Sequence, residues 1–294
     1  MTTDASTLAG AAIEIVDVFA AAPLEGNPLA VVRVDAMPDA ALRQAVARET
    51  NLAETTFVAT SPDVDGAWPV RIHTPAEELP FAGHPVLGTA WVVRERLARG
   101  GEVVTLATLQ GAVPVRFEAA GPGAKAWLQA PEVDIEVVHD LAPWLDALDV
   151  GAAEIDAVRV PAALVDIGPR FGVLHLRERE RLAALAPDPR LLRPLLASWR
   201  ATGVLAVAPA RDGEGDLAVR MFFEANGVRE DPATGSANAG LAALHRSVGF
   251  KGALEVTQGV EMLRPSRLSL RVETTRIEVG GAVWPVYAGA FASP

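Results

Sequence analysis

The stretch Val70-Arg71-Ile72-His73-Thr74-Pro75, followed by Ala82-Gly83-His84-Pro85 and by an apolar run from Ala90 to Leu97, has a counterpart later in the chain. The counterpart is Val219-Arg220-Met221-Phe222-Phe223, then Thr234-Gly235-Ser236-Ala237, then a run from Ala239 to Val248. Both stretches predict a strand, a loop, a turn that contains glycine, and a helix. The two glycines lie roughly 150 residues apart, a separation that a duplicated unit would give.

Three further pairs of segments repeat in the same order at about the same offset. They are Gly26-Asn27-Pro28-Leu29-Ala30-Val31-Val32 with Gly168-Pro169-Arg170-Phe171-Gly172-Val173-Leu174, Thr56-Phe57-Val58-Ala59 with Leu205-Ala206-Val207-Ala208, and Gln110-Gly111 with Gln258-Gly259. Matches in one order at a near-constant offset predict a duplicated domain. The alternative is that strand, turn and helix segments of any α+β chain resemble one another by chance.

The local patterns predict many strands and few helices in each half. Pro38 and Asp39 open one clear helix, and Asn51 suits a left-handed position at its end. The second half predicts helices near 189–201 and 237–248. The β-rich runs are 13–19, 29–34, 55–59, 69–73, 103–107 and 113–117. This pattern predicts an α+β fold with a sheet wrapped around one helix in each lobe, and a ligand site between the lobes.

A Pro- and Gly-containing polar stretch between Gly121 and Asp134 marks the predicted boundary. We therefore expect an N-terminal lobe over residues 1–130 and a C-terminal lobe over residues 131–294.

The composition narrows the possible functions. Half of the 294 residues are hydrophobic and the net charge is −11, which describes a folded chain with an acidic surface. Nucleic acid and anionic membranes are therefore poor partners. The chain has no cysteine, which excludes disulfides and thiolate chemistry. Neither a signal peptide at Met1 to Gly10 nor a membrane-spanning run is present, so we expect a cytoplasmic protein.

Two predicted helix starts offer backbone amides to an anion. His84 in Gly83-His84-Pro85 and Ser236 in Gly235-Ser236 lie where helical amide groups have no intrahelical acceptor. Glycine lets a ligand approach the backbone closely, so the two starts could bind a carboxylate. The alternative is that both are ordinary helix caps, with Ser236 as the capping residue.

Two acidic residues are candidates for proton transfer or binding. Glu54 stands between a helix end and an apolar strand, where loss of water would raise its pKa and suit it to acid/base catalysis. Other acids lie in polar stretches such as 177–181 and 212–216, where a solvated role is expected. Asp231 before Pro232 forms either a turn or a contact to a substrate hydroxyl or amine. A salt-bridged structural role for Glu54 is the alternative.

Several other sites are not indicated by the sequence. The histidines at 73, 139, 175 and 245 lack the spacing of metal ligands, and neither a phosphate-binding loop nor a dinucleotide fingerprint appears. The nucleophile motif Gly-X-Ser-X-Gly is also missing, which weakens a serine hydrolase.

Five blocks together resemble the PhzF-like family, whose lobes share the diaminopimelate-epimerase fold. They are Val16-Asp17-Val18-Phe19, Pro23-Leu24-Glu25-Gly26-Asn27-Pro28, the segment from Ala47 to Phe57, the segment from Glu78 to Ala90, and Glu230-Asp231-Pro232-Ala233-Thr234-Gly235-Ser236-Ala237. The resemblance implies an α+β fold of two pseudo-symmetric lobes, each a mainly antiparallel sheet around a central helix. It also implies that a last strand, at about 280–294, packs back on the N-terminal lobe.

The resemblance also implies roles. Glu54 matches the family's catalytic carboxylate, and His84 and Asp231 match residues that hold the substrate and assist proton movement. Gly83, Gly235 and Ser236 match contacts to a substrate carboxylate. The implied reaction isomerises trans-2,3-dihydro-3-hydroxyanthranilate by a proton shift on one face of the ring. It implies no metal or organic cofactor, a small carboxylate as the substrate, and a homodimer.

The chain departs from related enzymes at three positions. Related epimerases and proline racemases have a cysteine before the glycine at each helix start, where this chain has Ala82 and Thr234. The phenazine enzymes have serine where this chain has Ala53, so the exact substrate stays open. The alternatives are a non-catalytic protein that binds a small acid and an epimerase-like enzyme with another substrate.

Overall fold

The computed structural model describes residues 5–225 and 228–292. The chain divides into two compact units, which are described separately. The first comprises Met1–Leu128 and Gly280–Pro294, and the second comprises Gln129–Val279. Within the described residues no helix is long and apolar enough to cross a bilayer.

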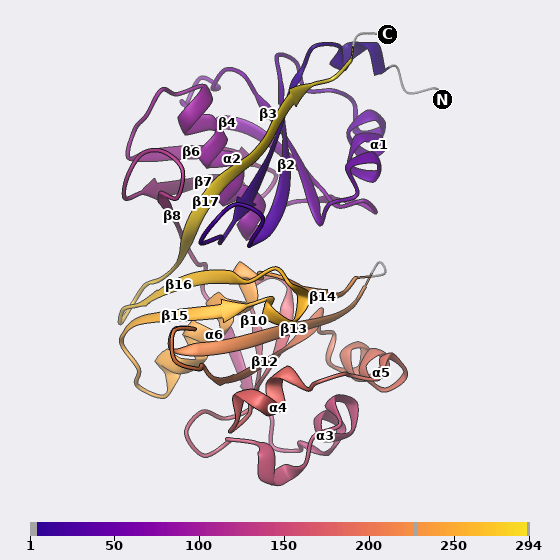
Figure 1. Ribbon diagram of the computed structural model, residues 1–294, viewed down its shortest axis with the longest axis vertical. Coiled ribbons are helices and arrows are strands. Elements are labelled where there is room, and N and C mark those ends of the chain that lie inside the picture. Colours follow the sequence, from indigo (N-terminus) through magenta and orange to yellow (C-terminus); the bar gives the residue numbers. More distant parts are fainter. Residues whose placement is uncertain (1–4, 226–227, 293–294) are drawn as a thin grey trace. The chain divides into compact units, whose positions relative to one another are not determined.

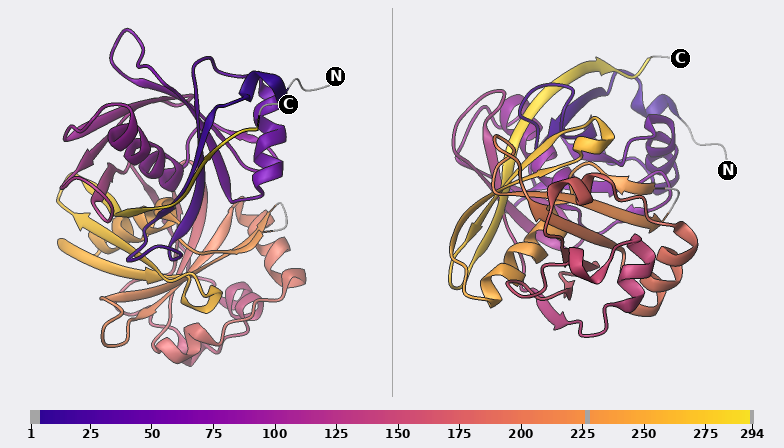
Figure 2. Two further views of the ribbon diagram at one scale, coloured as in Figure 1. Left: turned by 45° about the horizontal axis from the view of Figure 1, so that its top comes forward. Right: turned by 60° about the horizontal axis from the view of Figure 1, so that its bottom comes forward.

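In the first unit, strands surround one helix (Figures 1 and 2). The helices are α1 (Ala40–Thr50) and α2 (Gly83–Arg96), with a short 3₁₀ turn, η1 (Ala5–Leu8). The strands are β1 (Ala12–Val18), β2 (Asn27–Val34), β3 (Glu54–Ala59), β4 (Trp68–His73), β5 (Glu78–Leu79), β6 (Val103–Thr108), β7 (Gly111–Phe117), β8 (Lys125–Gln129), which leads out of the unit, and β17 (Ile277–Ala290), which leads back into it.

The strand pairings of this unit run in a closed ring. The order is β17, β1, β2, β3, β4, β6, β7 and β8, and β8 pairs with β17 again. The pairs β2–β3 and β4–β6 are parallel, while the others whose register is defined are antiparallel. Helix α2 packs against β1, β2, β3, β6 and β7, which explains why its residues from His84 to Arg94 are all buried.

The second unit repeats this plan with additional helices. Its helices are α3 (Ala142–Leu148), α4 (Arg179–Ala183), α5 (Pro189–Trp199) and α6 (Gly235–Ser247), with the short turns η2 (Ala152–Glu154) and η3 (Val260–Met262). Its strands are β9 (Asp134–Val137), β10 (Ala163–Asp166), β11 (Arg170–His175), β12 (Gly203–Pro209), β13 (Leu217–Ala225), β14 (Val228–Asp231), β15 (Gly252–Gln258) and β16 (Ser266–Val272).

The pairings confirm the duplication predicted from the sequence. In the first unit β2–β3 and β4–β6 are parallel, and in the second unit the corresponding β11–β12 and β13–β15 are parallel. The short hairpins β4–β5 and β13–β14 correspond in the same way, and each leads into the central helix of its unit. The expected class, α+β with two similar lobes around central helices, is confirmed.

The predicted caps of α1 are also confirmed. The side chain of Asp39 accepts a hydrogen bond from the amide of Leu42, and Asn51 has φ 50°, in the left-handed region. Leu42 and Val46 of this helix pack with Val32, Val34 and Phe57 on the face of the sheet opposite α2. In the second unit a larger cluster around Trp144 and Leu196 fills the space between α3, α5 and the sheet.

Corresponding glycines let each central helix approach the sheet closely. Gly88 of α2 and Gly240 of α6 both lie five residues after the first residue of their helix. A Cβ atom on Gly88 would lie 2.7 Å from Cδ2 of Leu29, and one on Gly240 would lie 2.5 Å from Cγ2 of Val165. Neither position has room for a methyl group, so the strands fix the depth of the helices.

We expect Gly240→Ala to destabilise the protein although alanine is the better helix former. Overpacking costs about 1–3 kcal/mol, while the helical preference of alanine over glycine returns about 0.5–1 kcal/mol. Urea unfolding should therefore show a lower free energy of unfolding. Adding Val165→Ala, which removes the methyl group that clashes, should make the double variant more stable than the sum of the single effects. An increase in stability for Gly240→Ala alone would contradict the close packing.

A second prediction concerns two histidines of the second unit. Nε2 of His175, at the end of β11, lies 3.1 Å from Nε2 of His245 on α6. Burial, and secondarily the charge of His245, lowers the pKa of His175 to about 3, and burial also lowers the pKa of His245. Below the unfolded pKa of about 6.5 the unfolded chain binds protons that the folded chain does not, so stability falls as the pH drops from there toward 3.

We therefore expect the free energy of unfolding to fall between pH 7 and pH 5, by up to about 1.4 kcal/mol per pH unit for each proton. The double variant His175→Gln/His245→Gln should flatten this slope, leaving the part due to His84 and His73, whose pKa values burial also lowers. His139→Gln, at an exposed position, serves as the control. An unchanged slope in the double variant would show that the pair does not titrate on unfolding.

Candidate active site

Glu54 stands where an α-helix gives way to a buried strand, as the sequence predicts. Helix α1 ends at Asn51, and Glu54 is the first residue of β3, directly opposite Leu29 of β2. The following residues Thr55 and Thr56 are fully buried. The side chain of Glu54 is 15% exposed, so its carboxylate is largely removed from water.

His84 lies beside this carboxylate. It is the second residue of α2, and its Nε2 atom is 3.1 Å from Oε2 of Glu54. Both atoms are buried, and among the described residues Nε2 of His84 makes no aligned hydrogen bond. The distance is that of a hydrogen bond while the alignment is not, a common state of catalytic pairs before substrate binds.

Burial keeps the imidazole of His84 neutral. It lowers the pKa of His84 to about 3. A carboxylate ion 3.1 Å away would act in the opposite direction, but the helix start at Gly83 also disfavours a positive charge, and burial dominates. A neutral imidazole with its proton on Nε2 can donate a hydrogen bond to a carboxylate or to the carbonyl oxygen of a carboxyl group. The pair therefore suits a carboxyl group that changes its protonation state.

Buried hydroxyl groups tie the strand of Glu54 to the helix of His84. Oγ1 of Thr56 on β3 lies 2.7 Å from Oγ1 of Thr89 on α2, and both residues are fully buried. Oγ1 of Thr55 lies 2.6 Å from Oγ1 of Thr50 at the end of α1. The sequence analysis did not single out these threonines, since a threonine in a strand is ordinary. The hydroxyl pairs fix the position of Glu54 relative to both helices.

The second unit brings Asp231, Gly235 and Ser236 together around the start of α6. Asp231 ends β14, and its Oδ2 atom accepts a hydrogen bond of 2.5 Å from Oγ1 of Thr234. Thr234 is the N-cap residue, and Gly235 and Ser236 are the first two residues of the helix. The alternative that Ser236 is the capping residue is therefore wrong, because a helix capped by Ser236 would begin at residue 237, two residues after the observed start at Gly235.

Gln258 is a buried hub that the sequence analysis noted as part of the repeat but gave no role. Its Nε2 donates to the carbonyl of Asp231 (2.8 Å) and to Oγ1 of Thr234 (3.1 Å). Its Oε1 accepts from the amide of Thr234 (3.2 Å) and from Nδ2 of Asn238 (3.0 Å). The next residue, Gly259, has φ 75°, and a Cβ there would lie 2.7 Å from the carbonyl oxygen of Pro232. The loop from Asp231 to Thr234 is thus held on two sides.

The two helix starts present different numbers of amides. The first intrahelical bonds come from Val86 to the carbonyl of Ala82 and from Asn238 to that of Thr234. The amides of Gly83 and His84 precede the first bond of α2, where Pro85 has no N–H to give. Those of Gly235, Ser236 and Ala237 precede the first bond of α6. Such amides favour an anionic ligand.

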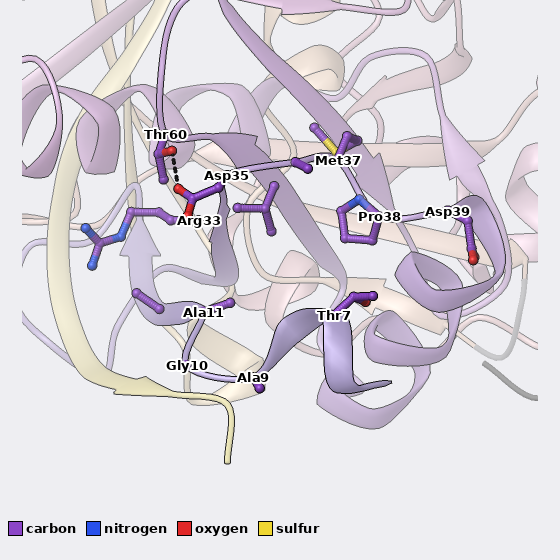
Figure 3. A pocket seen from close by; sticks show the side chains of 13 residues that line it. Thr7, Ala9, Gly10, Ala11, Arg33, Asp35, Met37, Pro38, Asp39 and Thr60 are labelled. Atoms are coloured by element: carbon purple, nitrogen blue, oxygen red, sulfur yellow. Dashed lines mark hydrogen bonds between the residues drawn. The ribbon is translucent and has the colours of Figure 1, made fainter. Parts of the chain in front are cut away.

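A hollow elsewhere in the first unit contains none of the candidate residues. Its volume is about 660 Å³, and its lining includes Arg33, Asp35, Met37, Asp39 and Thr60 (Figure 3). Asp35 accepts a hydrogen bond from Thr60 (2.6 Å), and Asp39 caps α1. Asp35 and Asp39 thus stabilise the local structure of this pocket. The pair of Glu54 with His84 is the better candidate for an active site. The described residues contain no group of three or more histidine or acidic side chains placed to hold a metal ion.

Comparisons with known proteins agree with the fold. The family model described as phenazine biosynthesis-like protein matches residues 16–289. The trans-2,3-dihydro-3-hydroxyanthranilate isomerase of Pseudomonas aeruginosa is 37% identical over 280 residues, which are 91% of this chain and 94% of that protein.

Solved structures give the same result. A phenazine biosynthesis protein of the PhzF family from Enterococcus faecalis superposes with a TM-score of 0.78 at 26% identity, covering 96% of this chain and 99% of that one. A probable proline racemase from Agrobacterium radiobacter, at 14% identity and a TM-score of 0.65, covers 97% of this chain and 93% of its own and shares the fold. The chain is thus an isomerase that belongs to the phenazine biosynthesis-like (PhzC-PhzF) family.

Proposed function

We propose that this isomerase moves a proton within a small unsaturated or cyclic carboxylic acid, and that Glu54 carries the proton. The observation that supports the proposal is the contact of 3.1 Å between Glu54 and a buried, neutral His84. The substrate of the relative from Pseudomonas aeruginosa, trans-2,3-dihydro-3-hydroxyanthranilate, is the first candidate for this chain.

In the proposed reaction the carboxylate of Glu54 takes a proton from one ring carbon, and the electron pair of that C–H bond moves into the adjacent π system. The resulting carboxyl group returns the proton to another carbon on the same face, and the enol formed becomes a ketone. No atom is gained or lost overall. His84 orients the carboxyl group and stays neutral in both states, because its Nε2–H can donate a hydrogen bond to a carboxylate oxygen and equally to the carbonyl oxygen of the protonated carboxyl group.

The helix starts are proposed to hold the substrate. The amides near Gly83, Gly235 and Ser236 suit a carboxylate, because unpaired helical N–H groups and the helix dipole favour negative charge. Asp231, hydrogen-bonded to Thr234, would accept a hydrogen from a hydroxyl or amine of the substrate. Substituting Glu54 in the first unit and Asp231 in the second tests whether residues of both units take part in one reaction.

The residues that precede Gly83 and Gly235 favour a proton transfer on one face of the substrate over racemisation. Ala82 and Thr234 are the N-cap residues of α2 and α6. An enzyme that inverts a carbon needs an acid and a base on opposite faces, and alanine at position 82 supplies neither. One carboxylate that takes and returns the proton satisfies the proposed reaction.

Glu54→Gln is expected to lower kcat on a dihydro-hydroxyanthranilate-type acid by about 10²–10⁴-fold, the contribution of a positioned acid/base. The amide keeps the size of the side chain but cannot carry the proton. Turnover is measured by proton NMR. Glu49→Gln, an exposed glutamate on α1, is the matched control and should keep the parent rate. Near-normal turnover in Glu54→Gln would remove this residue from the mechanism.

Deuterium exchange in heavy water separates the enzyme from a non-catalytic protein that binds a small acid. The parent protein should place solvent deuterium in part of the product, and Glu54→Gln should not. His84→Ala and Asp231→Asn should change KM as well as kcat, since the family resemblance implies that both residues hold the substrate in addition to assisting proton movement. A parent protein that binds the acid without turnover or exchange would favour the binding protein.

The proposed reaction requires no metal or organic cofactor, because the carboxylate moves the proton and amides hold the substrate. We expect kcat and KM to be unchanged after exhaustive dialysis against a chelator. The metal content of the dialysed protein is measured in parallel as the control. A loss of turnover that an added divalent cation restores would overturn this part of the proposal.

A further inference from the structure

A buried ion pair stands directly behind Asp231. The residue before it, Glu230, accepts two hydrogen bonds of 2.8 Å from Nε and Nη2 of Arg220 on β13. Both side chains are largely buried, at 9% and 16% exposure. This paired geometry is the most directional contact that a carboxylate makes with arginine.

Arg220 is itself fixed by the backbone. Its Nη1 donates to the carbonyl oxygens of Leu182 (3.2 Å), Ala183 (3.1 Å) and Leu185 (2.7 Å), at the end of α4. Its guanidinium also lies 4.7 Å above the ring of Phe222. The position of the Glu230 carboxylate is therefore set by rigid groups of the second unit.

The first unit also has a glutamate paired with arginine, six residues before His84 in the sequence. Glu78 of β5 accepts hydrogen bonds of 3.1 and 3.2 Å from Nη2 of Arg43 on α1, whose Nε donates to Nε2 of His73. Arg71 on β4 corresponds to Arg220, and its Nε lies 3.7 Å from Glu78. In this unit an arginine from a helix makes the closer contact.

Sequence and register match between the units. Glu78 and Glu230 each lie five residues before the first glycine of the central helix, and each is followed two residues later by proline. The strand pairings place His73 opposite Glu78 and Phe222 opposite Glu230. The glutamate is therefore shared by both helix starts, while the residue after it, Leu79 or Asp231, differs.

We propose that Glu230, held by Arg220, is a positioning residue for Asp231 and the start of α6, and that Glu78, held by Arg43, fixes the segment that leads from β5 to His84 at the start of α2. Successive residues of a strand point to opposite faces, so fixing Glu230 on one face sets the direction of Asp231 on the other. The role in catalysis rests on the proposed function, whereas the role in geometry does not.

The test is Glu230→Gln, which keeps the shape but places an NH₂ group against the N–H groups of Arg220. Misplacing a reacting group by about 1 Å can cost about 10²-fold in rate, so we expect a fall of that order in kcat/KM. A crystal structure of the variant, which needs no substrate, should show the contact between Asp231 and Thr234 broken. Glu78→Gln should likewise displace His84 from Glu54.

Glu214→Gln is the matched control. Glu214 is 19% exposed and pairs with the buried Arg179 at 3.0 Å in the same unit, but it does not adjoin Asp231. It should lower the thermal midpoint as Glu230→Gln does and leave kcat/KM near the parent value. Equal activity in the two variants together with an unmoved Asp231 would overturn the proposal. Asp231→Asn/Glu230→Gln should lose little more activity than Asp231→Asn alone.

The same assays distinguish this inference from the proposed function. If Glu54→Gln keeps full turnover, the proposed function fails, and the crystal structure of Glu230→Gln still decides the positioning role. If Glu54→Gln is inactive while Glu230→Gln matches Glu214→Gln in activity and geometry, only the positioning role fails.

Discussion

The enclosure of one helix by the strands of each unit sets the geometry of everything else. In the first unit the strand pairings close into a ring around α2, and Gly88 leaves no room between that helix and β1 and β2. A helix packed on all sides cannot slide along its axis without breaking many contacts at once. Its first residues therefore occupy a fixed place beside the first residue of β3. The contact between Glu54 and His84 is a consequence of this packing.

Burial of the helix start also explains the protonation state of His84. An imidazole in water is half protonated near pH 6.5, but burial lowers the pKa of His84 to about 3. A protonated His84 would form an ion pair with Glu54 and hold its carboxylate as the anion. A neutral His84 leaves the carboxyl group able to gain and lose a proton, so the packing that fixes the distance also provides the chemistry we propose.

The sequence predicted the structural elements that depend on local residue patterns. It did not predict the features that depend on contacts between residues far apart in the chain. The caps at Asp39 and Asn51, the central helices and the duplication follow from residue type and spacing. Helix α4, only five residues long, was not predicted, because it forms where Leu182 packs into the core. The expectation that the acids in 212–216 are solvated was wrong for Glu214, which is 19% exposed and pairs with the buried Arg179. The contact of Glu54 with His84 was not foreseen either, since it joins residues of two separate elements.

Comparison of the two units distinguishes residues that both units share around the start of the central helix from residues that differ between the units. Glycines at the first and sixth positions of the helix, a glutamate five residues before it, and a proline after the glutamate occur in both. The residue after the shared glutamate differs, Leu79 in one unit and Asp231 in the other. The residue after the first glycine of the helix differs as well, His84 in one unit and Ser236 in the other. A duplicated scaffold of this kind keeps the depth and direction of the helix while the side chains at its start are free to change. The contact between Glu54 and His84 in one unit and the contact between Asp231 and Thr234 in the other are therefore two variants of one structural arrangement, which has a glutamate at the same position in both units.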